Sequence, residues 1–134
     1  MESTPELVSR EHHHLSDLIA EVQEACRAGA DAAALRSLGR ELREAMDAHF
    51  VREEALYYPT VWALRADLER PLRALVRAHE VFRLQLSTID AALSDADTPE
   101  AGRLLAGFRD LFTLHERAEE ACLGGLGEPV RPAV

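Results

Sequence analysis

The sequence predicts an all-α protein, an up-down-up-down four-helix bundle, on three observations. Ala, Leu, Arg and Glu dominate its 134 residues, a composition that favours helix over sheet. Four segments repeat apolar residues with a period of 3.6, and none shows the alternation of a strand. The links between the segments are short, as they are between antiparallel neighbours. Hydrophobic residues make up 47% of the chain, so we expect residues 1–134 to form one domain with a real core.

The first helix is expected to begin after Ser3-Thr4-Pro5, because a hydroxyl can cap a helix and proline suits its first turn. Gly29 is expected to stop it. Its seam, the line of residues facing the core, comprises Val8, His12, Leu15, Ile19, Val22 and Cys26.

The second helix is expected to run from Asp31 to about Pro59, since proline cannot extend a helix. A connector over about 59–70 should then lay Trp62 and Leu64 over the core. The seam of this helix comprises Leu35, Leu38, Leu42, Ala45, His49, Glu53 and Leu56.

A third helix is expected from about Leu72, and a turn over 94–100 should supply Thr98 as cap and Pro99 as first helical residue of the fourth. The fourth helix should stop at Gly124-Gly125. The bundle then covers about 5–124, and 125–134 form a loose tail. The third seam comprises Leu72, Leu75, His79, Phe82, Leu86, Ile89 and Leu93. The fourth comprises Ala101, Leu104, Phe108, Leu111, His115, Glu119 and Cys122.

Six of these seam positions carry titratable side chains. Each helix has one histidine, and the second and fourth add a glutamate four residues later, on the same helix face. The six are His12, His49, Glu53, His79, His115 and Glu119. At a rise of about 1.5 Å per residue, all four histidines lie roughly 10 to 14 Å from the same end of an up-down bundle.

This placement indicates a metal site. A single histidine on an apolar face is more often a hydrogen-bonded core residue, but buried carboxylates without partners cost several kcal/mol each. A cation removes that cost, and imidazole with carboxylate suits iron, manganese or zinc. Six ligands exceed what one tetrahedral zinc uses. Two ions, each with two histidines and sharing two bridging carboxylates, use all six and leave coordination positions open.

Several neighbours of the six have simpler interpretations. His13 and His14 are expected on the surface, although either could replace His12 as ligand. Glu54 and Glu120 should be surface charges or partners of the ligands. Tyr57 could donate a hydrogen bond to the site, but packing is the simpler interpretation. The Cys122 thiol lies one turn past Glu119, and a small buried helix residue is again the simpler interpretation.

The motifs together resemble the haemerythrin-like HHE cation-binding domain over nearly the whole chain. They are EHHHL (11–15), HFVREEALYYP (49–59), AHEVF (78–82) and HERAEEACL (115–123). The resemblance implies a four-helix bundle with a non-haem di-iron centre and an oxo or hydroxo bridge. It implies that His12 and His49 bind one iron, that His79 and His115 bind the other, and that Glu53 and Glu119 bridge them; manganese or zinc could substitute.

One departure from that family bears on function. Oxygen-carrying haemerythrins have a further histidine one turn before the third-helix ligand, where this chain has Leu75. The remaining ligand set is similar to that of di-iron proteins for repair of iron centres, which add a cysteine-bearing N-terminal domain for which we expect no room in this chain. We therefore expect a more open centre.

The leading hypothesis is a di-iron protein that binds or reacts with dioxygen, nitric oxide or hydrogen peroxide, as sensor, scavenger or iron handler. An oxidase or peroxidase acting on a small organic substrate is the alternative, and it would need a pocket beside the metals larger than a diatomic requires. A metal-free or zinc-stabilised interaction module is the third hypothesis. The sequence names no redox partner and no catalytic residue beyond the ligands.

Charge and hydropathy argue against other partners. The net charge of −9 disfavours nucleic acid and anionic membranes. No stretch has the roughly 20 apolar residues of a membrane span, and the N-terminus does not resemble a signal peptide. Cys26 and Cys122 do not make a disulfide framework. The sequence therefore predicts a cytoplasmic protein.

Overall fold

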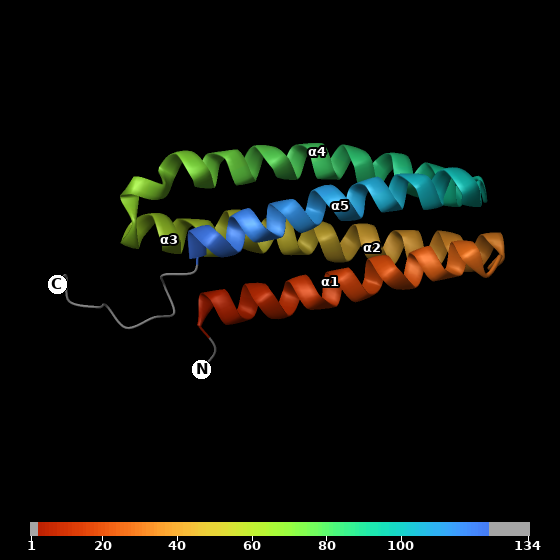
Figure 1. The fold of residues 1–134 in the computed structure, drawn as a ribbon, viewed down its shortest axis with the longest axis horizontal. Coiled ribbons are helices and arrows are strands. Elements are labelled where there is room, and N and C mark those ends of the chain that lie inside the picture. The colour runs from red at the N-terminus through yellow and green to blue at the C-terminus, as the bar shows by residue number, and fades with distance from the viewer. Residues whose placement is uncertain (1–2, 124–134) are drawn as a thin grey trace.

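The computed structural model describes residues 3–123, and in this part of the chain it is an antiparallel bundle of four long helices (Figure 1). The predicted all-α, up-down-up-down fold is confirmed. The long helices are α1 (Thr4–Arg27), α2 (Ala32–Arg52), α4 (Glu69–Ser94) and α5 (Thr98–Leu123). The shorter elements are a π-helical turn (Glu53–Tyr57), α3 (Tyr58–Leu64) and a 3₁₀ turn (Ala66–Leu68). The predicted stop at Gly124-Gly125 and the tail lie outside the described residues.

Local capping explains where the helices begin and end. The Ser3 hydroxyl accepts from the Glu6 backbone N–H, and the Glu6 carboxylate accepts from the Ser3 N–H, which makes a capping box. Asp31 caps α2 by accepting from the Ala34 N–H. Gly29 follows α1 with a φ of +72°, a left-handed conformation that glycine adopts without strain.

The expected cap of the last helix was wrong by one residue. Thr98 already belongs to α5, and the side chain that caps it is that of Asp97, which accepts from the Glu100 backbone N–H at 3.2 Å. A carboxylate is at least as good a cap as a threonine hydroxyl.

The expected helix end near Pro59 was also wrong. The chain continues from α2 through the π-helical turn into α3, and Tyr58 donates its backbone N–H to the Glu53 carbonyl, five residues back. Pro59 then falls in the first turn of α3, where a missing N–H is tolerated. The expected connector over 59–70 is therefore mostly helical.

The seams were predicted correctly at most positions, with errors in the second and fourth helices and in the expected connector. Leu56, Trp62 and Leu64 are 58%, 51% and 68% exposed rather than packed over the core. In α5, Leu105, Phe112 and Leu123 are buried in place of the expected Leu104, Leu111 and Cys122, each of which is the preceding residue. A one-residue step turns a helix by about 100°, so a line drawn in steps of three or four drifts off the true face.

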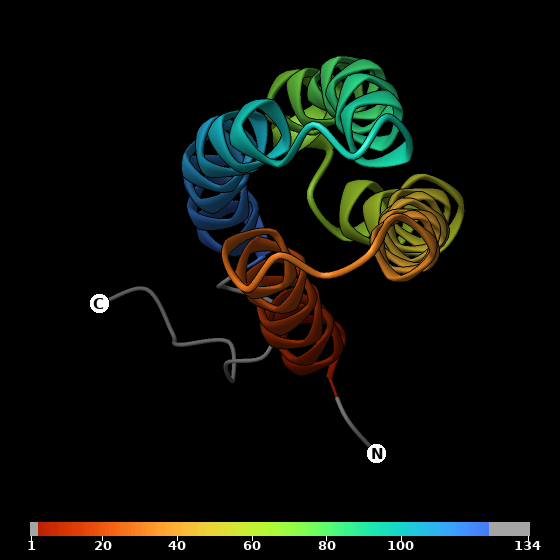
Figure 2. The same cartoon turned by 90° about the vertical axis from the view of Figure 1, so that its right-hand side faces the viewer.

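Viewed end-on, the four long helices stand at the corners of a square (Figure 2). Packing runs from α1 to α2, α2 to α4, α4 to α5 and α5 back to α1. The starts of α1 and α4 therefore lie beside the ends of α2 and α5, as the depth argument requires (Figure 1). Within residues 3–123 we find no helix of the length and apolarity that crossing a membrane needs.

Candidate metal centre

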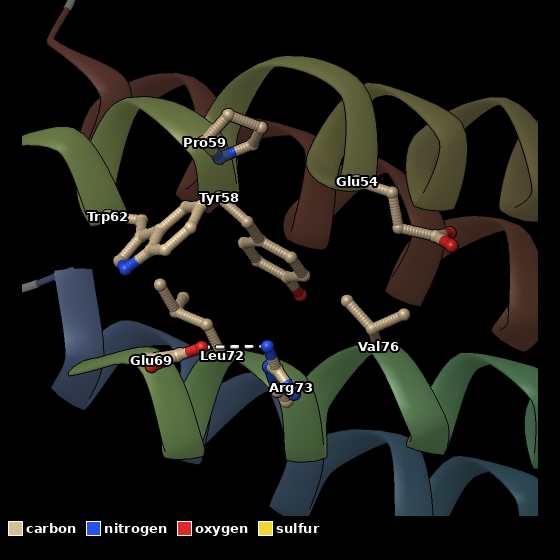
Figure 3. A pocket seen from close by; sticks show the side chains of 8 residues that line it. All are labelled: Glu54, Tyr58, Pro59, Trp62, Glu69, Leu72, Arg73 and Val76. Carbon is tan, nitrogen blue, oxygen red and sulfur yellow. Dashed lines mark ion pairs between the residues drawn. The ribbon is translucent and has the colours of Figure 1, made fainter. Parts of the chain in front are cut away.

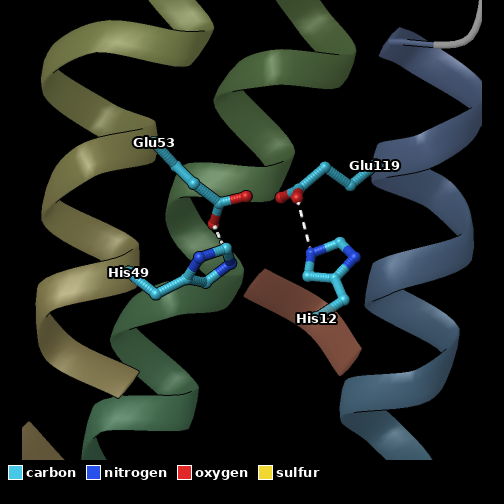
Figure 4. Close-up of side chains that lie close together, drawn as sticks. All are labelled: His12, His49, Glu53 and Glu119. Carbon is cyan, nitrogen blue, oxygen red and sulfur yellow. Dashed lines mark ion pairs between the residues drawn. The ribbon is translucent and has the colours of Figure 1, made fainter. Parts of the chain in front are cut away.

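The structure brings all six predicted side chains together inside the bundle, and all six are buried. They form two overlapping groups, and in each group four potential ligand atoms lie within 4.8 Å of one another. One group is His12, His49, Glu53 and Glu119, and the other is Glu53, His79, His115 and Glu119. We call these six residues the His/Glu cluster. Both carboxylates belong to both groups, and in Figure 4 they face each other across the bundle axis.

The four imidazoles share one orientation, with Nε2 directed at the carboxylates. One of these carboxylates, that of Glu53, lies at the start of the π-helical turn, directly after the last turn of α2. The Nε2-to-oxygen distances are 2.9 Å for His12 to Glu119, 3.2 Å for His49 to Glu53, 3.1 Å for His79 to Glu53 and 3.6 Å for His115 to Glu119.

Most of the inward-facing atoms nevertheless lack a hydrogen bond. Nε2 of His12 and Oε1 of Glu119 are only 2.9 Å apart, yet the contact does not have the direction of a hydrogen bond. The unpartnered buried atoms of the cluster are Nε2 of His12 and His115, both carboxylate oxygens of Glu53, and Oε1 of Glu119. Such atoms cost about 1–3 kcal/mol each when left unsatisfied. Their convergence fits a cation, because nitrogen and oxygen lone pairs then find a common partner.

The two carboxylates respond differently to their surroundings. Burial, reinforced by the neighbouring Glu119, raises the pKa of Glu53. Burial also opposes ionisation of Glu119, but His115 and His12 outweigh it and lower its pKa. Without a metal ion, the protein therefore holds a proton on one carboxylate of the pair. A divalent cation would take the place of that proton.

The histidines also differ. Burial, helped by His115, lowers the pKa of His79 to about 4. The imidazole is therefore neutral at physiological pH, the state that a metal requires. For His12 burial acts in the same direction, but contact with Glu119 overrides it and raises the pKa.

A carboxylate lies behind His49, on the side away from the cluster. Nδ1 of His49 is 2.9 Å from Oε2 of Glu11, and Glu11 also accepts from Arg52. Burial opposes ionisation of Glu11, but His49 and Arg52 together lower its pKa. A negative charge at Nδ1 fixes the ring with Nε2 free for a metal.

His79 has a matching arrangement on the other side of the bundle. Its Nδ1 is 3.2 Å from Oε2 of Glu54, which accepts from Arg83 at 2.8 Å. Nδ1 of His12 lies 3.3 Å from both Glu116 and Glu120. Among the described residues, no carboxylate pairs with Nδ1 of His115.

Sequence reasoning named Glu54 and Glu120 as possible partners of the ligands, and it missed Glu11 and Glu116. The available signal was position, because both stand beside a ligand histidine in the sequence, as EH at 11–12 and HE at 115–116. Each glutamate contacts a histidine on a helix other than its own. Predicting these contacts would have required the rotation of each helix about its axis.

Sequence reasoning also missed Tyr58. Its hydroxyl donates to Oε2 of Glu119 and lies 3.3 Å from Nε2 of His79. Burial, followed by the charge of Glu119, raises the pKa of this phenol, so it remains protonated as a donor. The π-helical turn rotates Tyr58 toward the site, a shift that the 3.6-residue pattern cannot reveal.

The other neighbours lie outside the cluster. His13 and His14 are exposed, while Tyr57 is buried in an apolar group with Val8, and Cys122 packs against that group. Leu75, one turn before His79, is buried in the same group as Tyr58.

The comparisons with known proteins agree with this geometry. The family model described as hemerythrin HHE cation binding domain matches residues 4–125. Searches of curated proteins and of solved structures found no match. The family match covers all four long helices and includes every residue of the His/Glu cluster. The buried histidines and glutamates make this a metal-binding site, and the chain belongs to the hemerythrin HHE cation-binding domain family.

Proposed function

We propose that the His/Glu cluster holds two iron ions, one at His12 and His49 and the other at His79 and His115. Glu53 and Glu119 would each bind both ions. The observation that carries this proposal is the pair of four-residue groups that share both carboxylates. A single ion would leave half of the inward-facing nitrogens without a partner.

The donor set supports iron as the resident metal. Neutral imidazole with carboxylate suits iron and also manganese or zinc, and the cluster contains no thiolate that would favour softer ions. Each ion would receive four protein ligands, fewer than the six of an octahedral ion, so positions remain for an external ligand.

We infer that this external ligand is a small diatomic or a peroxide: dioxygen, nitric oxide or hydrogen peroxide. Two irons would supply reversible one-electron chemistry toward such a molecule. The chain supplies a dry surrounding for it. Phe50 stacks on the His79 ring at 4.2 Å, and the ring of Phe82 lies 5.1 Å from that of His115. These aromatic rings pack against the imidazoles and shield them from water.

The proposal includes a cytoplasmic role as sensor, scavenger or iron handler, without nucleic acid or membrane as partner. Cys26 and Cys122 are free thiols, which is compatible with a reducing compartment.

The experiment that tests the proposal is absorption spectroscopy of the iron-loaded protein exposed to dioxygen, nitric oxide, peroxide or azide. We expect visible bands that change with the added ligand in the native protein. The Glu119→Ala variant, which lacks one shared carboxylate, should lose them. A native spectrum that responds to none of the four ligands would refute the proposed reactivity.

One observation favours a second candidate, an oxidase or peroxidase acting on a small organic molecule. Such an enzyme needs a cavity beside the metals that is larger than a diatomic requires. A cavity of about 190 Å³ is lined by Tyr58, the residue whose hydroxyl contacts Glu119 and His79.

A further inference from the structure

A cavity opens between α3 and α4, next to the His/Glu cluster (Figure 3). Its volume is about 190 Å³. The walls are mostly apolar or aromatic, and three charged side chains complete them. The lining residues are Glu54, Tyr58, Pro59, Trp62, Glu69, Leu72, Arg73 and Val76.

Two of the lining residues connect the cavity to the cluster. The Tyr58 ring lines the cavity, and its hydroxyl contacts Nε2 of His79 and Oε2 of Glu119. Glu54 also lines the cavity, and its carboxylate lies 3.2 Å from Nδ1 of His79. The cavity therefore lies on the His79 side of the cluster, one side chain away from a proposed metal ligand.

We propose that this cavity binds a small uncharged organic molecule about the size of one aromatic ring. A cavity of about 150 Å³ lined by apolar side chains accommodates benzene. The cavity here is larger, at about 190 Å³, and aromatic side chains contribute to its walls. Its role as the site of a co-substrate rests on the proposed metal centre, whereas the binding itself does not.

The charges around the cavity favour an uncharged guest, because each is already compensated. Glu69 and Arg73 form an ion pair of 2.7 Å within the lining, drawn as the dashed line in Figure 3. Glu54 accepts from Arg83 at 2.8 Å and contacts His79. A charged guest would lose its hydration without finding a free counter-charge.

The cavity is accessible from solvent, unlike a packing defect in the core. Trp62 is 51% exposed and belongs to the lining, so it stands at the rim. Water in such a site finds few hydrogen-bond partners along Pro59, Leu72 and Val76, so an apolar guest displaces it at low cost.

Trp62 provides a direct test, because it is the single tryptophan of the chain. The probe is iodobenzene, whose iodine quenches tryptophan fluorescence on contact, added to the full-length protein as purified with its metal. We expect saturable quenching. The charged analogue 4-iodobenzoate should quench only in proportion to its concentration, as a collisional quencher does.

Two substitutions on α4 form a matched pair. Val76→Phe puts a ring into the cavity, whereas Val81→Phe makes the same change at an exposed position. Iodobenzene should bind about tenfold or more weakly to the first variant and unchanged to the second, which is about 1.4 kcal/mol of lost affinity. The iodine in soaked crystals should give an anomalous peak between Tyr58 and Val76.

Linear quenching of the native protein by iodobenzene would overturn the proposal, and so would equal affinity in the two variants. Equal saturable binding of 4-iodobenzoate would overturn its preference for an uncharged guest. Metal analysis of the same samples is an independent measurement. If the purified protein contains no iron, the di-iron proposal is refuted. Saturable binding of iodobenzene to that same protein would still support the cavity site.

Discussion

Glu53 and Glu119 are the residues on which the proposed di-iron centre depends. Both side chains are 0% exposed, and most of their oxygens lack hydrogen-bond partners. Two buried carboxylates at close range repel each other, and the bundle tolerates them because four imidazoles surround them. Two buried negative charges have to be neutralised by either a proton or a cation. The convergence of the ligand atoms favours the cation.

Removing one shared carboxylate should therefore remove metal. Glu119→Ala deletes a ligand of both proposed ions, and we expect metal content to fall by about half or more, since each ion would lose one of its protein ligands. His13→Ala changes an exposed histidine of α1 and should leave the metal content unchanged. Mass spectrometric metal analysis of both purified variants decides this. Full metal retention in Glu119→Ala would refute the bridging assignment.

The carboxylates behind the histidines act through orientation. Glu11→Gln weakens the partner of Nδ1 of His49, and we expect metal affinity to fall by about 10- to 100-fold. Glu21→Gln on the same helix alters an exposed residue and serves as control. Competition with a chelator of known affinity measures both. Equal affinities in the two variants would show that Glu11 does not position His49.

At the scale of the elements, close approach of the helices sets the spacing of the ligands. Gly39 on α2 faces α4, where an added Cβ would lie 2.8 Å from Cδ1 of Leu93 and 3.1 Å from Oδ1 of Asp90. Leu93 is fully buried, so it has little room to move. This contact keeps α2, which supplies His49, close to α4, which supplies His79.

Alanine at two glycines should have opposite effects. Gly39→Ala should destabilise the protein by about 1–3 kcal/mol through overpacking. The higher helix propensity of alanine offsets part of this cost. Gly107→Ala on α5 meets nothing within 4 Å and should stabilise by about 0.5–1 kcal/mol. Urea unfolding of both variants measures the difference. A Gly39→Ala variant as stable as Gly107→Ala would show that α2 and α4 are not closely packed here.

The sequence predicted the elements and the six residues of the His/Glu cluster because both follow from helical periodicity. A His-x-x-x-Glu pair stays on one face of any α-helix, so His49 with Glu53 and His115 with Glu119 were identifiable without coordinates. Tyr58 was not, because the π-helical turn rotates everything after Glu53.

Contacts between helices were equally inaccessible. Glu11 reaches His49 from another helix, and the cavity beside Tyr58 depends on how α3 leans over α4. These features arise from tertiary packing, which residue spacing within one helix does not encode.

At the scale of the whole molecule, we expect metal binding and folding to be coupled. The six proposed ligands come from α1, the α2–π-turn segment, α4 and α5, so an ion in the cluster would tie the four long helices together. A ligand that binds only the folded state raises its stability. The metal should therefore stabilise the bundle as a unit and not one helix alone.

This stabilisation should depend on pH. The pKa of Glu53 is raised to about 11 in the metal-free protein, and that of His12 is raised as well. Between pH 8 and 5 the folded state therefore keeps a proton on Glu53 that the unfolded chain releases, so falling pH stabilises the metal-free folded state. Metal-bound ligands cannot take up these protons, so the gain in Tm on metal loading should shrink as pH falls from about 8 to 5. Thermal unfolding with and without chelator measures it. A gain that stays constant or increases toward pH 5 would contradict the linkage.

The most direct test of the central claim is the metal content of the native protein. Protein without an affinity tag, purified from iron-supplemented cells, should contain two irons per chain by mass spectrometry, one for each four-residue group. No metal, or a single zinc per chain, would contradict the di-iron account.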